Sequence, residues 1–244
     1  QSLIGEEYRP GDSAESDDEV LAFARQYGAT IFHPSGTCKM APADDPMGVV
    51  DTRLRVRGVA GLRVIESAIL APASITTAFA DLGAEVIKIE TPAGDYIREM
   101  TWPIIEGVSL MHYHINRGKR SLTLDLRKES AREVYRDLVR GADVVIEGSK
   151  PGALARFGLG YDELRAVNPK IVFCTISGYG TTGPYKDMPS HGIAYDTWSG
   201  VVKPAYDEQG FCYIAEHVAI GIGAAPLYGG LAVLAGVLRA RATG

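Results

Sequence analysis

The clearest pattern in the chain joins apolar positions at helical spacing to a short apolar run of strand length. Within residues 78–90, Phe79 and Leu82 are spaced as on one face of a helix. Gly83 can adopt the left-handed conformation that ends a helix, and residues 85–89 then form a β-branched run. A helix, a glycine turn and a buried strand in this order are typical of a layered α/β fold.

The same alternation continues along the chain. Further strands are expected at residues 63–66, 122–126, 143–147 and 170–175, and further helices at 130–141, 151–158 and 162–167. Ser130 is the expected N-cap of the first of these helices, and Pro151 suits the first turn of the second. Strands that alternate with helices at this spacing indicate parallel βαβ units. The pattern therefore predicts an α/β fold with an open parallel sheet flanked by helices.

One segment has the length of a membrane span. Residues 218–238 carry no charge, and about 20 apolar residues suffice to cross a bilayer. The run is mostly Gly and Ala, with Pro226 near its middle, so its transfer into lipid is weakly favourable. We therefore expect a close-packed helix in a protein core and no membrane partner.

Composition narrows the possible functions. A chain of 244 residues with 46% hydrophobic and 23% charged residues can fold as one large or two small domains. The net charge of −5 argues against a general nucleic-acid binder. Cys38, Cys174 and Cys212 are too widely spaced for a disulfide framework or a metal site, which predicts a cytoplasmic protein without a metal.

The first unit, residues 1–68, contains a capping box at Ser16 and Glu19 and then His33-Pro34-Ser35-Gly36-Thr37 and Gly61-Leu62-Arg63-Val64-Ile65-Glu66. This series resembles the C-terminal part of the glucose-methanol-choline flavin oxidoreductases, and it predicts a small α+β remnant of that family. In the family the histidine of this motif faces the flavin and helps to remove the alcohol proton, so the resemblance gives that role to His33. The chain has no Gly-x-Gly-x-x-Gly fingerprint at a strand-to-helix turn, so FAD binding is not expected and His33 is interpreted as a relic.

The second unit, residues 69–244, resembles the family III CoA-transferases, which include formyl-CoA transferase and α-methylacyl-CoA racemase. The resemblance rests on residues 78–90, on Gly94-Asp95 and on residues 116–122. It implies a Rossmann-like, CoA-binding N-terminal half, truncated at its C-terminus. It also implies the interlocked homodimer of that family. The whole chain is then expected to be a chimera of two reading frames, or else a natural fusion.

The resemblance also assigns the positions that contact CoA. They are Ile69, Leu70, Ala71, Leu124, Arg127, Gly148, Ser149 and Arg156. Thr91 replaces an arginine of the family, and Gly148-Ser149 replaces its Asn-Phe pair. Phosphates of CoA require cations, and the candidates are Arg117, Lys119, Arg120, Arg127, Lys150 and Arg156. Of these, Lys119 and Arg120 are expected to be solvated surface charges.

The catalytic candidates follow from the same resemblance. Glu216 stands where the transferases have an aspartate that attacks the acyl-CoA thioester, and His191 matches the histidine of the racemases. Asp196 is a spare carboxylate or a cap of the helix around Trp198. The expected reaction is CoA transfer between an acyl-CoA and a free carboxylic acid. The alternatives are epimerisation of a 2-methylacyl-CoA, a flavin alcohol dehydrogenase fragment, and a non-catalytic remnant.

Overall fold

A computed structural model describes residues 61–243 except 69, 101–102, 190 and 215–218, together with residues 16, 18, 42, 44 and 45. The helix and the histidine motif expected before residue 61 lie outside the described residues, apart from those isolated positions. The structural description therefore concerns the second unit and the strand that leads into it.

A five-stranded parallel sheet forms the centre of the fold, with strand order β5-β2-β1-β6-β7. The strands are β1 (Arg63–Ser67), β2 (Glu85–Glu90), β5 (Arg120–Thr123), β6 (Val144–Glu147) and β7 (Val172–Thr175). This confirms the predicted α/β fold with an open parallel sheet. Because β1 lies in the middle, the sheet includes residues on both sides of the predicted boundary at residue 68.

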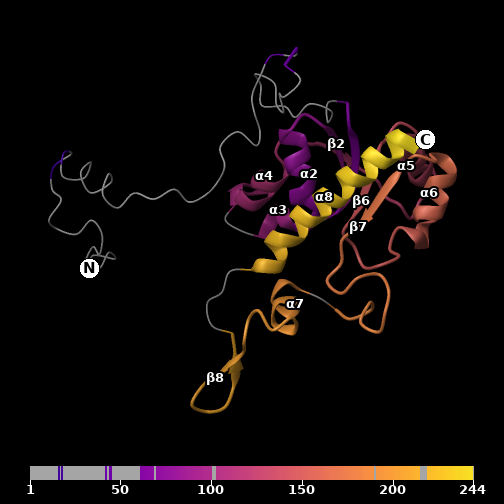
Figure 1. Cartoon of the computed structure of the whole chain (residues 1–244). Helices are drawn as coiled ribbons and strands as arrows, with labels where there is room; N and C mark the ends of the chain where they lie inside the picture. The colour runs from indigo at the N-terminus through magenta and orange to yellow at the C-terminus, as the bar shows by residue number, and fades with distance from the viewer. Residues whose placement is uncertain are drawn as a thin grey trace.

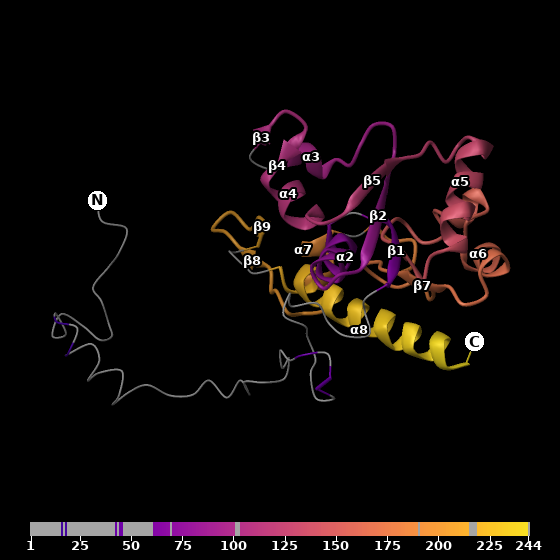
Figure 2. The same ribbon diagram turned by 90° about the horizontal axis from the view of Figure 1, so that it is seen from above.

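Helices cover both faces of the sheet, and α2 and α5 lie on opposite sides of it (Figure 2). On one face, α2 (Ala71–Asp81) and α8 (Ile220–Thr243) pack over Val64 and Ile146. On the other face, α5 (Glu129–Arg140) and α6 (Tyr161–Val167) pack over Ile65 and Val145. Successive residues of one strand point to opposite faces, which is why the apolar runs of β1 and β6 serve both cores.

Short elements fill the long connections. Between β2 and β5 lie α3 (Ile97–Met100), β3 (Pro103–Ile105), β4 (Val108–Ser109) and α4 (Leu110–Asn116). After β7 the chain forms α7 (Gly192–Trp198) and a hairpin of β8 (Ala205–Tyr206) and β9 (Cys212–Tyr213), which extends away from the sheet (Figure 1). A single 3-10 turn, Ala155–Phe157, follows β6.

Two element predictions were wrong. The helix expected at residues 151–158 is present only as the 3-10 turn Ala155–Phe157, which Gly158 ends in the left-handed conformation. Residues 151–154 are turns, and Gly152 has φ +75°, which breaks the helical path. The strand expected at 122–126 begins two residues earlier and ends at Thr123, as an edge strand with a mostly exposed, polar sequence.

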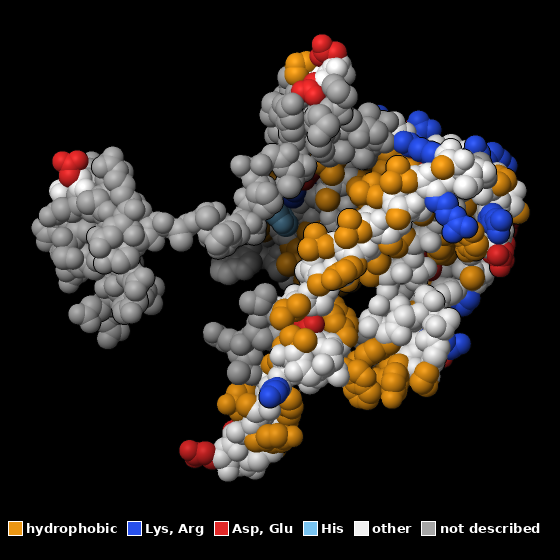
Figure 3. Space-filling model, in the orientation of Figure 1, with side chains coloured by type: hydrophobic (Ala, Val, Ile, Leu, Met, Phe, Trp, Pro, Cys, Tyr) orange, Lys and Arg blue, Asp and Glu red, His pale blue; other side chains and the backbone are white. Residues whose placement is uncertain are grey.

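The helix α8 is long and apolar enough to cross a membrane, but only a small part of it is buried. Gly229, Val233 and Val237 are its buried residues, and they face α2 and β7. The outer face exposes Leu227, Tyr228, Leu231 and Leu238, and hydrophobic side chains follow the helix along the surface (Figure 3). The described residues thus cover one side of α8 only, so the expectation of a close-packed helix inside a protein core was wrong.

Candidate functional site

Two loops lie side by side where the strand order of the sheet reverses. From β1 the chain continues to β2 on one side, whereas from β6 it continues to β7 on the other. The loop after β1 leads through Leu70 into α2, and the loop after β6 begins at Gly148. In an open parallel sheet, ligands bind at the carboxyl ends of the strands at such a switch point. The fold therefore places the candidate site here.

A first hollow of about 580 Å³ lies over the ends of β2, β5 and β6. Its walls come from four stretches of chain, namely residues 67–68, 88–95, 124–127 and 149–157. Apolar side chains such as Leu124, Leu154 and Phe157 form much of the surface, with Arg127 at its side. Arg127 pairs at 2.7 Å with Asp125, which lines the same hollow. A flat, partly apolar group would suit this lining.

A second hollow of about 760 Å³ lies over the start of α2. It is lined by residues 70–72, 148–151 and 176–179, and by parts of α7 and α8. Lys150, Arg156 and Lys186 bring three cations to its wall, against the single carboxylate of Asp187. Ser149 lines both hollows, so a long ligand could pass from one to the other across the loop after β6.

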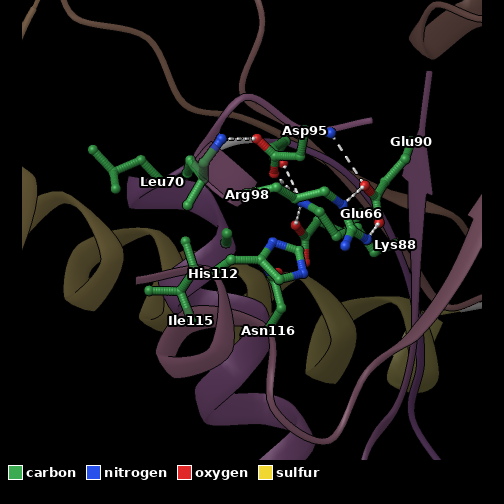
Figure 4. Close-up of polar contacts among 12 residues, drawn as sticks. Glu66, Leu70, Lys88, Glu90, Asp95, Arg98, His112, Ile115 and Asn116 are labelled. Atoms are coloured by element: carbon green, nitrogen blue, oxygen red, sulfur yellow. Dashed lines mark hydrogen bonds and ion pairs between the residues drawn. The ribbon is translucent and has the colours of Figure 1, made fainter. Parts of the chain in front are cut away.

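A cluster of buried ion pairs joins the ends of β1 and β2, and Figure 4 shows three of its members, Glu66, Lys88 and Asp95. The Glu66 carboxylate, at the end of β1, is 2.8 Å from Lys88 Nζ and 2.7 Å from Lys119 Nζ. Lys88 Nζ also lies 2.9 Å from Asp95 Oδ2. All four side chains are at most 3% exposed. Glu66 and Lys88 are direct neighbours in the register of β1 and β2.

The two lysines differ in their pKa. Burial opposes the charge of Lys88, but the carboxylates of Glu66 and Asp95 outweigh it and raise the pKa of Lys88. For Lys119 burial dominates, and it lowers the pKa to about 8 despite the attraction of Glu66. Lys88 is therefore the cation that Glu66 and Asp95 hold most firmly.

A second ion pair beside this cluster fixes the end of β2. Arg98 binds both oxygens of Glu90, with Nη2–Oε1 at 2.7 Å and Nε–Oε2 at 2.9 Å. Ser121 also donates to Glu90, at 2.6 Å. Burial disfavours the charged carboxylate, but these hydrogen bonds outweigh it and lower the pKa of Glu90 to about 2.

We expect Glu90 to make the protein sensitive to acid. The pKa of Glu90 is about 2 in the fold, against 4.5 for the free side chain, so its stabilising effect is complete above pH 4.5 and is lost as the pH falls towards 2. Glu90→Gln should therefore lose less stability than the wild type between pH 6 and pH 3, by on the order of 2 kcal/mol. Urea unfolding at both pH values measures this. Glu85→Gln is the control for removing a carboxylate from β2, and equal losses in Glu90→Gln and the wild type would contradict the prediction.

Comparison with known proteins identifies the fold. Residues 59–244, more than half of the chain, match the model of the family described as CoA-transferase family III. The chain belongs to CoA-transferase family III. Residues 2–79 match the family described as GMC oxidoreductase, and the two matches overlap over β1 and most of α2. Both resemblances that were expected from the sequence are thereby confirmed.

Several relatives are CoA-transferases by name. The chain is 38% identical to the succinate–glutarate CoA-transferase of Agrobacterium fabrum, over 71% of this chain and 44% of that one. It is 31% identical to the formyl-CoA:oxalate CoA-transferase of Streptomyces avermitilis, over 77% and 46%. The crystal structure of a CAIB/BAIF family protein from Brucella suis matches with a TM-score of 0.67 and 38% identity, over 76% of this chain and 50% of that one. The chain spans about half the length of these proteins.

The hollows bring together the positions that the family resemblance assigns to CoA. Ile69 lies outside the described residues, and each of the other seven lines a hollow. The first hollow includes Leu124, Arg127 and Ser149, and the second includes Leu70, Ala71, Gly148, Ser149 and Arg156. These residues come from three loops that are far apart in the sequence. The assignment of CoA contacts to them remains a prediction, which their common location supports.

The expected cation cluster is divided in the structure. Arg127, Lys150 and Arg156 line the hollows, whereas Arg117 pairs with Asp81 and Arg120 with Glu85. Arg120 is 78% exposed, as expected, but Lys119 is 2% exposed, so its expected place on the surface was wrong. The reason is Glu66, whose buried charge needs a second cation besides Lys88.

The structure describes two of the four catalytic candidates, His191 and Asp196. Glu216 and His33 lie outside the described residues. His191 precedes α7 as its N-cap residue and lines the second hollow. Asp196 is only 4% exposed, and its Oδ1 accepts a hydrogen bond from the Gly221 N–H at 2.8 Å. It therefore caps α8; the expectation that it caps the helix around Trp198 was wrong, since Asp196 lies inside that helix.

Sequence reasoning missed the buried cluster. Lys88 lies on the buried face of β2, between Val86 and Glu90, and a buried ammonium group requires a carboxylate partner. That was the available signal. Among the described residues no group of three or more His, Cys, Asp or Glu side chains could hold a metal ion.

Proposed function

We propose that this chain binds CoA across the two hollows, with the loop after β6 between its two parts. The observation that carries the proposal is the location of seven assigned CoA positions on these hollows, at the switch point of the sheet. Arg127 on the first hollow, with Lys150 and Arg156 on the second, supplies charges for the phosphates of CoA. The acidic total of the chain does not oppose this, because the cations gather locally.

We further propose CoA transfer from an acyl-CoA to a free carboxylic acid, with Glu216 as nucleophile. A carboxylate oxygen of Glu216 attacks the thioester carbonyl, which forms a mixed anhydride and releases the CoA thiolate. The thiolate then attacks the glutamyl carbonyl, so the donor acid leaves and a glutamyl–CoA thioester remains. The acceptor carboxylate repeats the two steps in reverse order, which regenerates Glu216 and gives the new acyl-CoA. Relatives named for succinate, glutarate, malate and oxalate suggest a small dicarboxylic acid as substrate.

Thermal unfolding with and without millimolar CoA tests the binding site. CoA at about 100 times its dissociation constant should stabilise the fold by roughly 2.7 kcal/mol. We expect a clear upward shift in the wild type and its loss in Arg127→Ala/Arg156→Ala. Arg140→Ala is the matched control, since Arg140 is an exposed arginine paired with a nearby aspartate, as Arg127 is, but lies on α5. A cooperative transition that CoA does not move would contradict the proposal.

Product analysis separates the possible reactions. Transfer predicts labelled glutaryl-CoA from succinyl-CoA and labelled glutarate, with loss of product in Glu216→Gln. Epimerisation is the second candidate because His191 lines the second hollow. It would instead exchange the α-hydrogen of a 2-methylacyl-CoA with deuterium from the solvent. Flavin absorbance in the purified protein would favour the dehydrogenase fragment, and CoA binding without any of these reactions a non-catalytic protein.

We also propose a cytoplasmic homodimer without a membrane or nucleic-acid partner. The exposed apolar side chains of α8 support a protein partner, since patches of this kind mark interaction surfaces. The net charge of −5 supports the absence of nucleic acid. Sedimentation of the purified chain measures its state of association.

A further inference from the structure

The turn between β1 and α2 has an unfavourable backbone conformation. Leu70 has φ 53° and ψ −99°, and it is the only residue other than glycine with positive φ in the described part of the chain. A branched side chain rarely adopts such a conformation, which persists only where the surroundings hold it. Leu70 also lines the second hollow, so its conformation shapes that wall.

Two buried lysines hold the backbone on either side of this turn. Lys88 Nζ donates to the carbonyl of Ala68 at 2.9 Å, and Lys119 Nζ donates to the carbonyl of Ala73 at 2.8 Å. These carbonyls lie two residues before Leu70 and three residues after it. Each lysine also binds one oxygen of Glu66, so a single carboxylate fixes the positions of both ammonium groups.

We propose that Glu66, Lys88 and Lys119 form a clamp that holds the Leu70 turn in the conformation that CoA requires. The three are positioning residues, since they act through the backbone carbonyls of Ala68 and Ala73. The inference rests on the proposed function, in which Leu70 and Ala71 contact CoA. Lys88 extends the clamp to the loop after β2 through Asp95, which lines the first hollow. One buried cluster thus sets the walls of both hollows.

The cost of burying these charges supports a role beyond stability. Removing two ammonium groups and a carboxylate from water is unfavourable, and apolar residues of similar size often stabilise a fold equally well. A purely apolar cluster would provide no hydrogen-bond donor to the backbone beside Leu70. Only a donor can bind the carbonyl of Ala68 before the turn and that of Ala73 in the first turn of α2. The Ala73 carbonyl also accepts from the hydroxyls of Thr76 and Thr77, but these lie on α2 itself, so only Lys119 links it to Glu66.

The test compares Lys119→Met with Arg117→Met. Both variants remove a cation that contacts α2. Lys119 binds the carbonyl of Ala73 near the start of the helix and also pairs with Glu66, whereas Arg117 pairs with Asp81, its last residue. CoA affinity is measured by calorimetry at a temperature where each variant is folded by circular dichroism. Amide hydrogen exchange of the peptide that covers residues 67–77 is measured without CoA. Val139→Ala, a substitution in the core on the other face of the sheet, controls for lower stability alone.

We expect Lys119→Met to raise the dissociation constant of CoA about tenfold and to speed exchange at residues 67–77, since the turn is no longer preorganised. Arg117→Met and Val139→Ala should change neither. If Lys119→Met does not fold, Asn116→Ala should show the same effects to a smaller degree, since it removes a 3.2 Å contact to Lys119 together with a 3.1 Å contact to His112. Unchanged affinity and unchanged exchange would overturn the clamp. If the wild type does not bind CoA, the proposed function fails, while the exchange measurement still decides whether the clamp exists.

Discussion

Replacing Glu66 by methionine should lower the free energy of unfolding by about 3 kcal/mol or more, because it removes one charge from a buried cluster and leaves the others. Lys119 would keep only the carbonyl of Ala73 and the side chain of Asn116 as partners. Lys88, in contrast, would keep its ion pair with the carboxylate of Asp95. Urea unfolding at pH 7 measures the change.

A second substitution distinguishes charge from packing. In Glu66→Met/Lys119→Met the ammonium group without a carboxylate is absent, while Lys88 and Asp95 still form a pair. We therefore expect the double variant to be more stable than Glu66→Met, although it has lost more of the original contacts. A double variant that is less stable than Glu66→Met would show that the contacts themselves, and not the uncompensated charge, hold this region together.

Much of the fold could be predicted because the apolar runs are local. The strand that starts at Glu85 and the helix that ends before Gly83 are both present, and Gly83 has φ +99° as its role required. The connection from residue 97 to residue 116 could not be predicted, since its helices and strands have between two and seven residues. Segments of that length show no periodicity, and they are fixed by contacts such as the Ser109 hydroxyl with the backbone of Ile97.

The candidate site shows the same division. Gly148, Arg127 and Arg156 could be identified from the sequence, because ligands bind at the ends of the strands in any open parallel sheet. The role of Lys119 could not, because it depends on the distance between the segment before β5 and the end of β1. Arg117 and Arg120, two residues before Lys119 and one residue after it, do lie at the surface, so the neighbouring residues predicted the wrong environment for Lys119.

The close contact between the two loops of the switch point leads to the last prediction, which concerns Gly148. A Cβ atom on this residue would lie 2.5 Å from Pro72 Cγ and 3.1 Å from Ala68 Cβ. Real Cβ atoms essentially never come within 3.0 Å of another heavy atom, as this one would with Pro72, so Pro72 and the start of α2 would have to move away from β6. Gly148→Ala should therefore destabilise the protein by about 1–3 kcal/mol, the usual cost of overpacking. It should also weaken CoA binding, since Pro72 and Gly148 both line the second hollow.

Gly223→Ala is the matched control, with the opposite expected sign. Gly223 lies in α8, nothing is within 4 Å of the added Cβ, and alanine is favoured over glycine in a helix by roughly 1 kcal/mol. Thermal unfolding of both variants, with and without CoA, separates the effects on stability and binding. Destabilisation of Gly148→Ala with full CoA affinity would mean that Pro72 can shift without changing the hollow, and that the two loops do not form one binding surface. Loss of both stability and CoA affinity in Gly148→Ala, beside a stabilised Gly223→Ala, would show that the start of α2 leaves no room for a side chain at residue 148 and that the two loops form one binding surface.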